Sequence, residues 1–118
     1  MNILVVDDDA LIRDMLCRVV GIMGHTAIGA CNGKDALDVI SGSIDLVISD
    51  CDMPVMSGPE MLAALKSDPR VAHVPVIMMS GDFDNCKATE SAFAFVSKPF
   101  STDTLIKEIN RALAQGSK

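Results

Sequence analysis

Polar residues able to bind a cation or a phosphoryl group stand where four separate apolar runs of this chain end. Asp7 and Asp8 follow the first run. The three later runs are followed by Asp50, Ser80 and Lys98, respectively. If the runs are parallel buried strands, their carboxyl ends lie along one edge of a sheet, where open α/β folds bind their ligands. The sequence therefore predicts that three carboxylates, a hydroxyl and an ammonium share one crevice.

The carboxylates of Asp7, Asp8 and Asp50 predict a site for a divalent cation. Like charges a few ångströms apart raise each other's pKa values unless a cation neutralises them. Oxygen ligands without a histidine or cysteine pattern favour Mg²⁺ over zinc, and a small ligand set leaves coordination positions for water or phosphate oxygens. Two simpler interpretations stay open: the run from Asp7 to Asp9 as a solvated helix start, and Asp50 as a loop cap.

Lys98 and Ser80 extend this prediction to phosphoryl chemistry. An ammonium at another strand end can pair with a carboxylate and contact a phosphoryl oxygen, while a hydroxyl can donate a hydrogen bond to the same group. Positioning and charge neutralisation supply most of the catalysis in phosphoryl transfer. We therefore expect transfer to a carboxylate, with Asp50 as the nucleophile.

The elements that would position these residues are strands alternating with helices. Apolar runs of strand length alternate with segments of helical period, which predicts five β-α units and a parallel sheet with helices on both faces. The first helix is expected to have its N-cap at Asp9 and its stop at Gly24, and the later helices are expected over 33–41 with Asn32 as the cap, from Pro59, briefly over 87–92, and from 101 or 102 to 116. Strands are expected over 25–30 and 74–79.

Composition limits the classes of function. The chain has 118 residues, is 49% hydrophobic and carries a formal charge of −6, so it is the size of one domain with an acidic surface, which argues against direct nucleic-acid binding. No apolar run reaches the roughly 18 residues of a membrane span, and no secretory leader is evident. We expect a cytoplasmic protein whose cysteines are reduced and mostly act as small buried packing groups: Cys17, Cys31, Cys51 and Cys86.

Taken together, the motifs resemble the receiver domain of two-component response regulators along the whole chain. The matching segments are 3–8 (ILVVDD), 45–50 (DLVISD) with Met53-Pro54 and Gly58, 75–81 (PVIMMSG) and 98–100 (KPF). The resemblance implies one receiver domain over 1–118 with a flavodoxin-like, doubly wound, five-stranded parallel sheet, (βα)5, of strand order 2-1-3-4-5. It also implies that an aspartate accepts a phosphoryl group from a phosphohistidine of a sensor kinase or phosphotransfer protein.

The resemblance assigns a role to each matching residue. Asp50 would be the phosphoacceptor; Asp7, Asp8 and the backbone carbonyl of Asp52 would hold Mg²⁺ with it; Ser80 and Lys98 would bind phosphoryl oxygens. Ser80 and Phe95 would form a switch that changes the face made by the fourth helix, fifth strand and fifth helix, where a downstream protein binds. Plain core packing is the alternative for Phe95. Such a domain catalyses its own phosphorylation and dephosphorylation and is not a turnover enzyme.

The chain departs from the family pattern between Ser80 and Lys98. This segment is shorter than usual by about one helical turn, and Ser91-Ala92-Phe93-Ala94 replaces the common Gly-Ala pair before the last strand. We expect a short or distorted fourth helix and an unusual partner surface with exposed Phe83 and Phe93. The joint at Lys98-Pro99 resembles the cis peptide of the family.

Two other classes of function stay open. Asp50-Cys51-Asp52 is a D-x-D motif, which occurs with a nucleophile and a general acid in phosphohydrolases of the haloacid dehalogenase type. That family carries the motif after its first strand, whereas here it follows the third. The other alternative is a pseudo-receiver that binds partners without phosphorylation, against which the complete set of acidic, hydroxyl and lysine positions counts.

Overall fold

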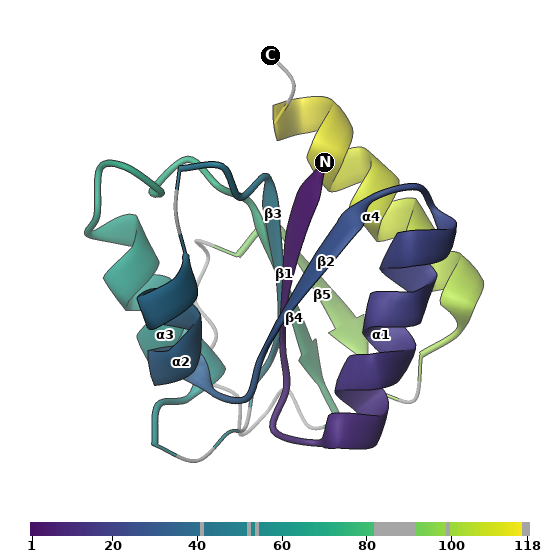
Figure 1. The fold of residues 1–118 in the computed structure, drawn as a ribbon, viewed down its shortest axis with the longest axis horizontal. Helices are drawn as coiled ribbons and strands as arrows, with labels where there is room; N and C mark the ends of the chain where they lie inside the picture. The colour runs from purple at the N-terminus through teal and green to yellow at the C-terminus, as the bar shows by residue number, and fades with distance from the viewer. Residues whose placement is uncertain (41, 52, 54, 82–91, 99, 117–118) are drawn as a thin grey trace.

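A computed structural model of the chain describes residues 1–40, 42–51, 53, 55–81, 92–98 and 100–116. Its five strands form one parallel sheet in the order β2-β1-β3-β4-β5 (Figure 1), which confirms the expected strand order. The strands are β1 (Asn2–Val6), β2 (Thr26–Ala30), β3 (Leu46–Asp50), β4 (Val76–Ser80) and β5 (Ala94–Ser97).

Four helices in the described residues cover both faces of the sheet. They are α1 (Ala10–Ile22), α2 (Gly33–Val39), α3 (Gly58–Lys66) and α4 (Thr102–Gly116). In Figure 1, α2 and α3 lie on one side of the sheet and α1 and α4 on the other. Because helices cover both faces, every residue of the interior strands β3 and β4 is buried. Two separate hydrophobic cores result, one on each face of the sheet.

Side-chain caps start the helices where the sequence predicts. The carboxylate of Asp9 accepts hydrogen bonds from the backbone N–H groups of Leu11 and Ile12, and Asn32 accepts one from Asp35 N–H. A third cap was not expected from the sequence: Ser57 and Glu60 form a reciprocal capping box at α3. These caps satisfy backbone donors that would otherwise lack partners.

Some predicted boundaries differ from the structure. The helix expected over 33–41 ends at Val39, since Ile40 already has an extended ψ of 144°. The strand expected over 74–79 is shifted to 76–80, so it includes Ser80. The third helix begins at Gly58, one residue before Pro59. Gly24 follows the end of α1 with φ +90°, a conformation that glycine adopts readily, which confirms it as the stop.

The prediction about the fourth helix falls on residues 82–91, which lie outside the described residues, as does Phe83. The other residue expected to be exposed, Phe93, is half-buried, and the guanidinium carbon of Arg111 on α4 lies 5.5 Å from the centre of its ring. The expectation for Phe93 is therefore wrong, because α4 covers part of the ring and adds a cation–π contact.

The cysteines also differ from expectation. Cys17 and Cys31 are free thiols, but Cys31 is exposed rather than buried. Cys51 is 2% exposed, as a packing residue should be, yet it is disulfide-bonded. Cys86 lies outside the described residues. The expectation of a reduced thiol is therefore wrong at Cys51, and the packing role does not apply to the exposed Cys31. No helix among the described residues is long and apolar enough to cross a bilayer.

Candidate functional site

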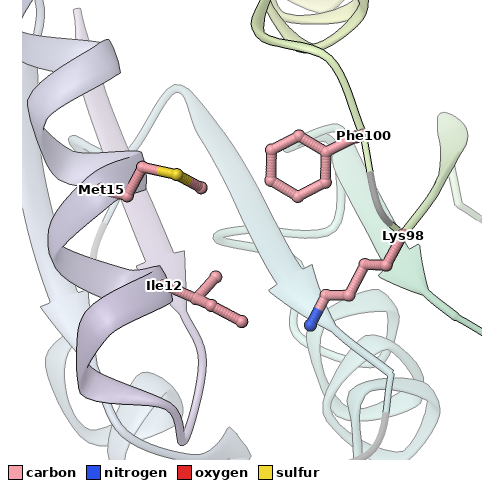
Figure 2. Close-up of a pocket in the computed structure, with 4 residues that line it drawn as sticks. All are labelled: Ile12, Met15, Lys98 and Phe100. Atoms are coloured by element: carbon pink, nitrogen blue, oxygen red, sulfur yellow. The ribbon is translucent and has the colours of Figure 1, made fainter.

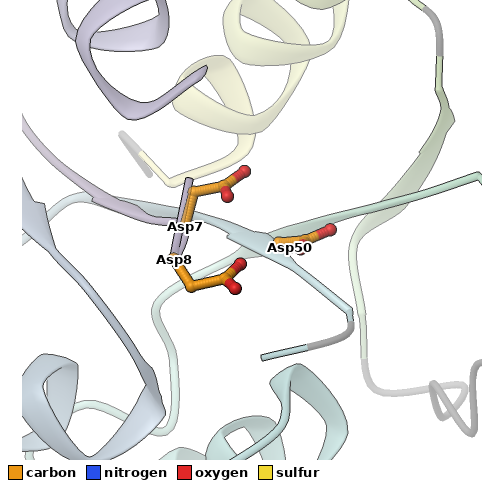
Figure 3. A group of neighbouring side chains, drawn as sticks. All are labelled: Asp7, Asp8 and Asp50. Atoms are coloured by element: carbon orange, nitrogen blue, oxygen red, sulfur yellow. The ribbon is translucent and has the colours of Figure 1, made fainter. Parts of the chain in front are cut away.

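The three predicted carboxylates meet at the carboxyl edge of the sheet. Asp7 and Asp8 directly follow β1, and Asp50 is the last residue of β3. One carboxylate oxygen from each lies within 4.8 Å of the other two, and Figure 3 shows the three side chains extending toward the same side. Asp7 is fully buried, Asp50 is 8% exposed and Asp8 is exposed. The site is therefore an acidic crevice open at one side.

Strand register explains this meeting. Val6 of β1 pairs with Ser49 of β3, so the residue that follows each of them lies at the same edge. Parallel neighbours end at the same side of a sheet, and β1 and β3 are adjacent although 39 residues of chain separate Val6 from Leu46. The predicted juxtaposition therefore follows from strand order and register.

The backbone of Asp7 is held from both sides. Its N–H donates to the carbonyl of Ala30 at 3.1 Å, and its own carbonyl accepts a hydrogen bond of 2.7 Å from Nη1 of Arg13. Its Oδ1 accepts a hydrogen bond of 2.9 Å from the N–H of Asp9. Sequence reasoning did not identify Arg13. The available signal was the position of Arg13, about one turn into an amphipathic helix that directly follows the aspartates.

Lys98 supplies the positive charge of the crevice. Its Nζ lies 2.9 Å from Oδ1 of Asp50 and 3.5 Å from Oδ2 of Asp7. Its backbone N–H donates to the carbonyl of Ser80 at 2.8 Å, which holds the end of β5 against the end of β4. The ammonium thus reaches two of the three carboxylates and leaves Asp8 without a salt bridge among the described residues.

The pKa shifts of Asp50 and Lys98 reflect an excess of negative charge in the crevice. Burial raises the pKa of Asp50, and the nearby charge of Asp7 raises it further, while the hydrogen bond and charge of Lys98 oppose this rise without cancelling it. For Lys98, burial alone would lower the pKa, but the hydrogen bond and charge of Asp50 and the charge of Asp7 together raise it. The ammonium therefore stays protonated at neutral pH.

The donor set fits a hard divalent cation. Oδ2 of Asp7 is buried and has no hydrogen-bond partner in the described part of the chain, since the 3.5 Å separation from Lys98 is too long for a well-formed hydrogen bond. A buried carboxylate oxygen without a donor is costly unless a cation contacts it. Three carboxylates that offer oxygens within 4.8 Å of one another match the preference of Mg²⁺ for oxygen ligands.

The start of α3 packs closely against the backbone of Asp50. Gly58 opens α3 directly against it: its N–H donates to the carbonyl of Cys51, and a Cβ at this position would overlap the carbonyl oxygen of Asp50. Ser49 Oγ donates to the same Asp50 carbonyl at 2.9 Å. Glycine is therefore required at position 58 because two backbone segments approach closely there.

The remaining predicted residues are placed as follows. Ser80 is the last residue of β4, is 1% exposed, and lies at the same edge as the carboxylates. Phe95, in β5, is 46% exposed, so its ring lies at the surface. Asp52, with the carbonyl predicted to bind the metal, and Pro99, of the predicted cis peptide, lie outside the described residues.

A hydrophobic cavity of about 400 Å³ borders the crevice on the side of α1. It is lined by Ile12, Met15, Phe100 and the stem of Lys98, with Ile12 and Met15 extending from α1 toward the other two (Figure 2). The stem of Lys98 therefore lies against apolar surface while its ammonium reaches the carboxylates, as long cationic side chains commonly do.

The chain matches the response regulator receiver domain over residues 3–110. It belongs to this family. Among curated relatives of this receiver domain, the chemotaxis protein CheY of Pseudomonas aeruginosa is 32% identical over 117 residues, which cover 94% of each chain. The match assigns the chain to two-component signalling and removes the support for a haloacid dehalogenase type of phosphohydrolase.

Solved structures agree with the fold of this receiver domain. A response regulator receiver domain protein from Clostridium thermocellum superposes with a TM-score of 0.87 at 30% identity, covering 98% of this chain and 96% of that one. The chemotaxis response regulator CheY4 of Vibrio cholerae gives a TM-score of 0.85 at 28% identity, covering 95% of this chain and 98% of that one. These similarities confirm the flavodoxin-like receiver fold that the sequence predicts.

Proposed function

We propose that this receiver domain, spanning residues 1–118, accepts a phosphoryl group from a phosphohistidine onto Asp50 in a Mg²⁺-dependent reaction. The observation that carries the proposal is the 2.9 Å contact between Lys98 Nζ and Asp50 Oδ1 inside a crevice of three carboxylates. An ammonium fixed beside a carboxylate nucleophile can also bind an oxygen of the incoming group. The donor is a sensor histidine kinase or a histidine phosphotransfer protein.

Asp7, Asp8 and Asp50, with the backbone carbonyl of Asp52, would hold Mg²⁺. When bound, the ion supplies positive charge that offsets the carboxylates and the oxygens of the transferred group. The exposed position of Asp8 and the lack of a hydrogen bond at Oδ2 of Asp7 support this assignment. Lys98 alone leaves an excess of two negative charges in the crevice, because one ammonium faces three carboxylates.

In the transfer step, a carboxylate oxygen of Asp50 attacks the phosphorus of the phosphohistidine. The P–N bond breaks, its electron pair returns to the imidazole nitrogen, and that nitrogen takes up a proton from solvent as the acyl phosphate forms. Lys98 and Ser80 bind the oxygens of the transferred group, which stabilises the charge on its three equatorial oxygens. Hydrolysis of the acyl phosphate later restores Asp50, so the domain is a self-modifying switch and not a turnover enzyme.

Phosphorylation would then change the surface around β5. In the proposed switch, the Ser80 hydroxyl moves toward the new phosphoryl group and the ring of Phe95 turns inward, which alters the face that a downstream protein binds. The 46% exposure of Phe95 is compatible with the proposal, because a ring at the surface is not fixed by core packing. The proposal includes a cytoplasmic location, since the phosphoryl group of the donor comes from ATP, and no direct contact with nucleic acid or membrane.

Intact-mass measurement tests the chemistry. Wild-type protein incubated with acetyl phosphate and Mg²⁺ should gain the mass of one phosphoryl group, and Asp50→Ala should not. Asp14→Ala, which removes an exposed carboxylate of α1, is the matched control and should gain the same mass as wild type. No gain in wild type would favour the pseudo-receiver, and a gain in Asp50→Ala would place the acceptor elsewhere.

Fluorescence tests the switch. The chain has no tryptophan and no tyrosine, so Phe95→Trp introduces a single indole fluorophore. Its emission should shift to shorter wavelength on addition of acetyl phosphate and Mg²⁺, because the ring leaves water. Phe100→Trp serves as the control ring outside the proposed switch. An unchanged spectrum of Phe95→Trp in fully phosphorylated protein would contradict the inward movement.

A further inference from the structure

Arg13 is the residue of α1 that reaches back to the loop between β1 and α1. Its Nη1 donates a hydrogen bond of 2.7 Å to the backbone carbonyl of Asp7. Its aliphatic stem passes over Gly29 of β2, since a Cβ added to this glycine would be 3.4 Å from Arg13 Cδ and 3.7 Å from Cγ. The side chain is half-buried, and its tip is held by the hydrogen bond to Asp7.

The bonded carbonyl belongs to the peptide unit that joins Asp7 to Asp8. Holding this peptide plane sets the direction in which the chain continues to Asp8, whose side chain is exposed and packs against little else. The N–H of Asp7 is already held by Ala30, so Arg13 completes the restraint on both sides of the residue. The hydrogen bond of Arg13 therefore restrains the peptide unit next to which both carboxylates of the loop extend.

Arg13 also leaves the acidic groups free. In the described segments, no ion pair joins Arg13 to a carboxylate, and its hydrogen bond goes to a backbone oxygen. A guanidinium bound directly to Asp7 or Asp8 would occupy the oxygens that a cation needs. Through the carbonyl, it orders the loop without competing for them.

We propose that Arg13 is a positioning residue that orients Asp7 and Asp8 for binding of a divalent cation. The inference rests on the Mg²⁺ binding proposed above and adds a residue that does not itself contact the ion. Groups that support metal ligands through hydrogen bonds typically change metal affinity by about 10- to 100-fold when removed.

The direction in which Mg²⁺ affinity changes when Arg13 is replaced distinguishes a positioning role from a purely electrostatic one. Arginine carries a positive charge close to the site, so its removal by charge alone would strengthen Mg²⁺ binding. Loss of positioning has the opposite effect. Arg13→Met keeps an unbranched stem against Gly29 but removes both the donor and the charge, and Arg13→Lys keeps a charged donor.

Isothermal titration calorimetry with MgCl₂ measures this directly, without any phosphodonor. We expect the Kd of Arg13→Met to rise about tenfold and that of Arg13→Lys to stay within a few-fold of wild type. Arg18→Met is the matched control, because Arg18 is an exposed arginine of the same helix whose side chain lines a different pocket, together with Val19 and Ile22. Its Kd should equal that of wild type or be slightly lower.

For each variant, the melting temperature of the metal-free protein is also measured by circular dichroism. An equal or lower Kd in folded Arg13→Met would overturn the inference while leaving the proposed function intact. A lower melting temperature with unchanged Kd would likewise overturn it, as a purely structural role predicts that result. If Arg13→Met does not fold, Arg13→Gln takes its place with the same expected weakening. Wild-type protein that binds no Mg²⁺ would overturn the proposed function and this inference together.

Discussion

Lys98 and Asp50 form an ion pair of 2.9 Å that spans the end of β4, the strand that lies between their own strands. The contact joins the last residue of β3 to the residue that follows β5. It requires both strands to end at the same level, which the register between Ser80 and Ser97 provides. The proposed acceptor and its counter-charge are thus positioned by the sheet, and four predictions concern this region.

Lys98→Met should slow phosphorylation of Asp50 by acetyl phosphate on the order of 100-fold, the usual effect of removing one donor to developing oxyanion charge. The methionine keeps an apolar stem along the cavity that Ile12, Met15 and Phe100 also line, so packing is largely preserved. The rate is measured from intact mass over time. Lys107→Met, which removes an exposed lysine of α4, should leave it unchanged. Equal rates for Lys98→Met and wild type would show that the ammonium does not contact the transferred group.

Asp50→Asn should raise the melting temperature of the metal-free protein at pH 7. Burial raises the pKa of Asp50 above its ordinary value of 3.8, so the folded protein binds this proton more readily than the unfolded chain. The free energy of unfolding therefore falls as the pH rises from about 3.8 through the raised folded pKa, and the loss is complete above it. Asparagine has no such titration.

The gain from Asp50→Asn should accordingly shrink as melts are repeated from pH 7 down to about pH 4. Asp14→Asn, at an exposed position of α1, provides the comparison. A lower melting temperature for Asp50→Asn at pH 7 would mean that the lost ion pair with Lys98 outweighs the relief of burial and of repulsion from Asp7.

Gly58→Ala should destabilise the fold by about 1–3 kcal/mol, the usual range for overpacking. The new Cβ would overlap the carbonyl oxygen of Asp50, lie 2.7 Å from Sδ of Met78 and lie 3.1 Å from Cα of Cys51, so backbone must move. Gly21→Ala is the matched control in α1, where a Cβ meets nothing within 4 Å. It should stabilise by roughly 1 kcal/mol through helix propensity. Urea unfolding of both variants gives the comparison, and equal stabilities would contradict the close approach.

Val55→Gly should stabilise the protein by on the order of 1 kcal/mol. Val55 lies in the loop between β3 and α3 with φ 70°, a left-handed conformation that is strained for a β-branched residue. Glycine removes this strain although it loses more backbone entropy on folding. Val39→Gly, at an exposed valine in the last turn of α2, should instead destabilise. Chemical denaturation measures both, and a less stable Val55→Gly would show that the valine side chain contributes contacts that exceed the strain.

Local sequence signals were sufficient for the elements and for much of the crevice. Apolar runs and capping residues such as Asp9 and Asn32 act over a few neighbouring residues, so they can be recognised from the sequence alone. The meeting of Asp7, Asp8 and Asp50 was predictable for a similar reason, because strand ends of a parallel sheet share one edge. The strand order itself was available only through resemblance to a known family.

The amino-acid sequence by itself thus determined which groups could do chemistry and at which strand ends they stand. Tertiary structure decided their environments: Asp7 is fully buried while its neighbour Asp8 is exposed, although both follow the same strand. It also decided that Arg13 bonds to a carbonyl and that α4 covers Phe93. Burial and hydrogen bonding depend on segments far apart in the chain that meet only after folding, and no local pattern encodes those contacts.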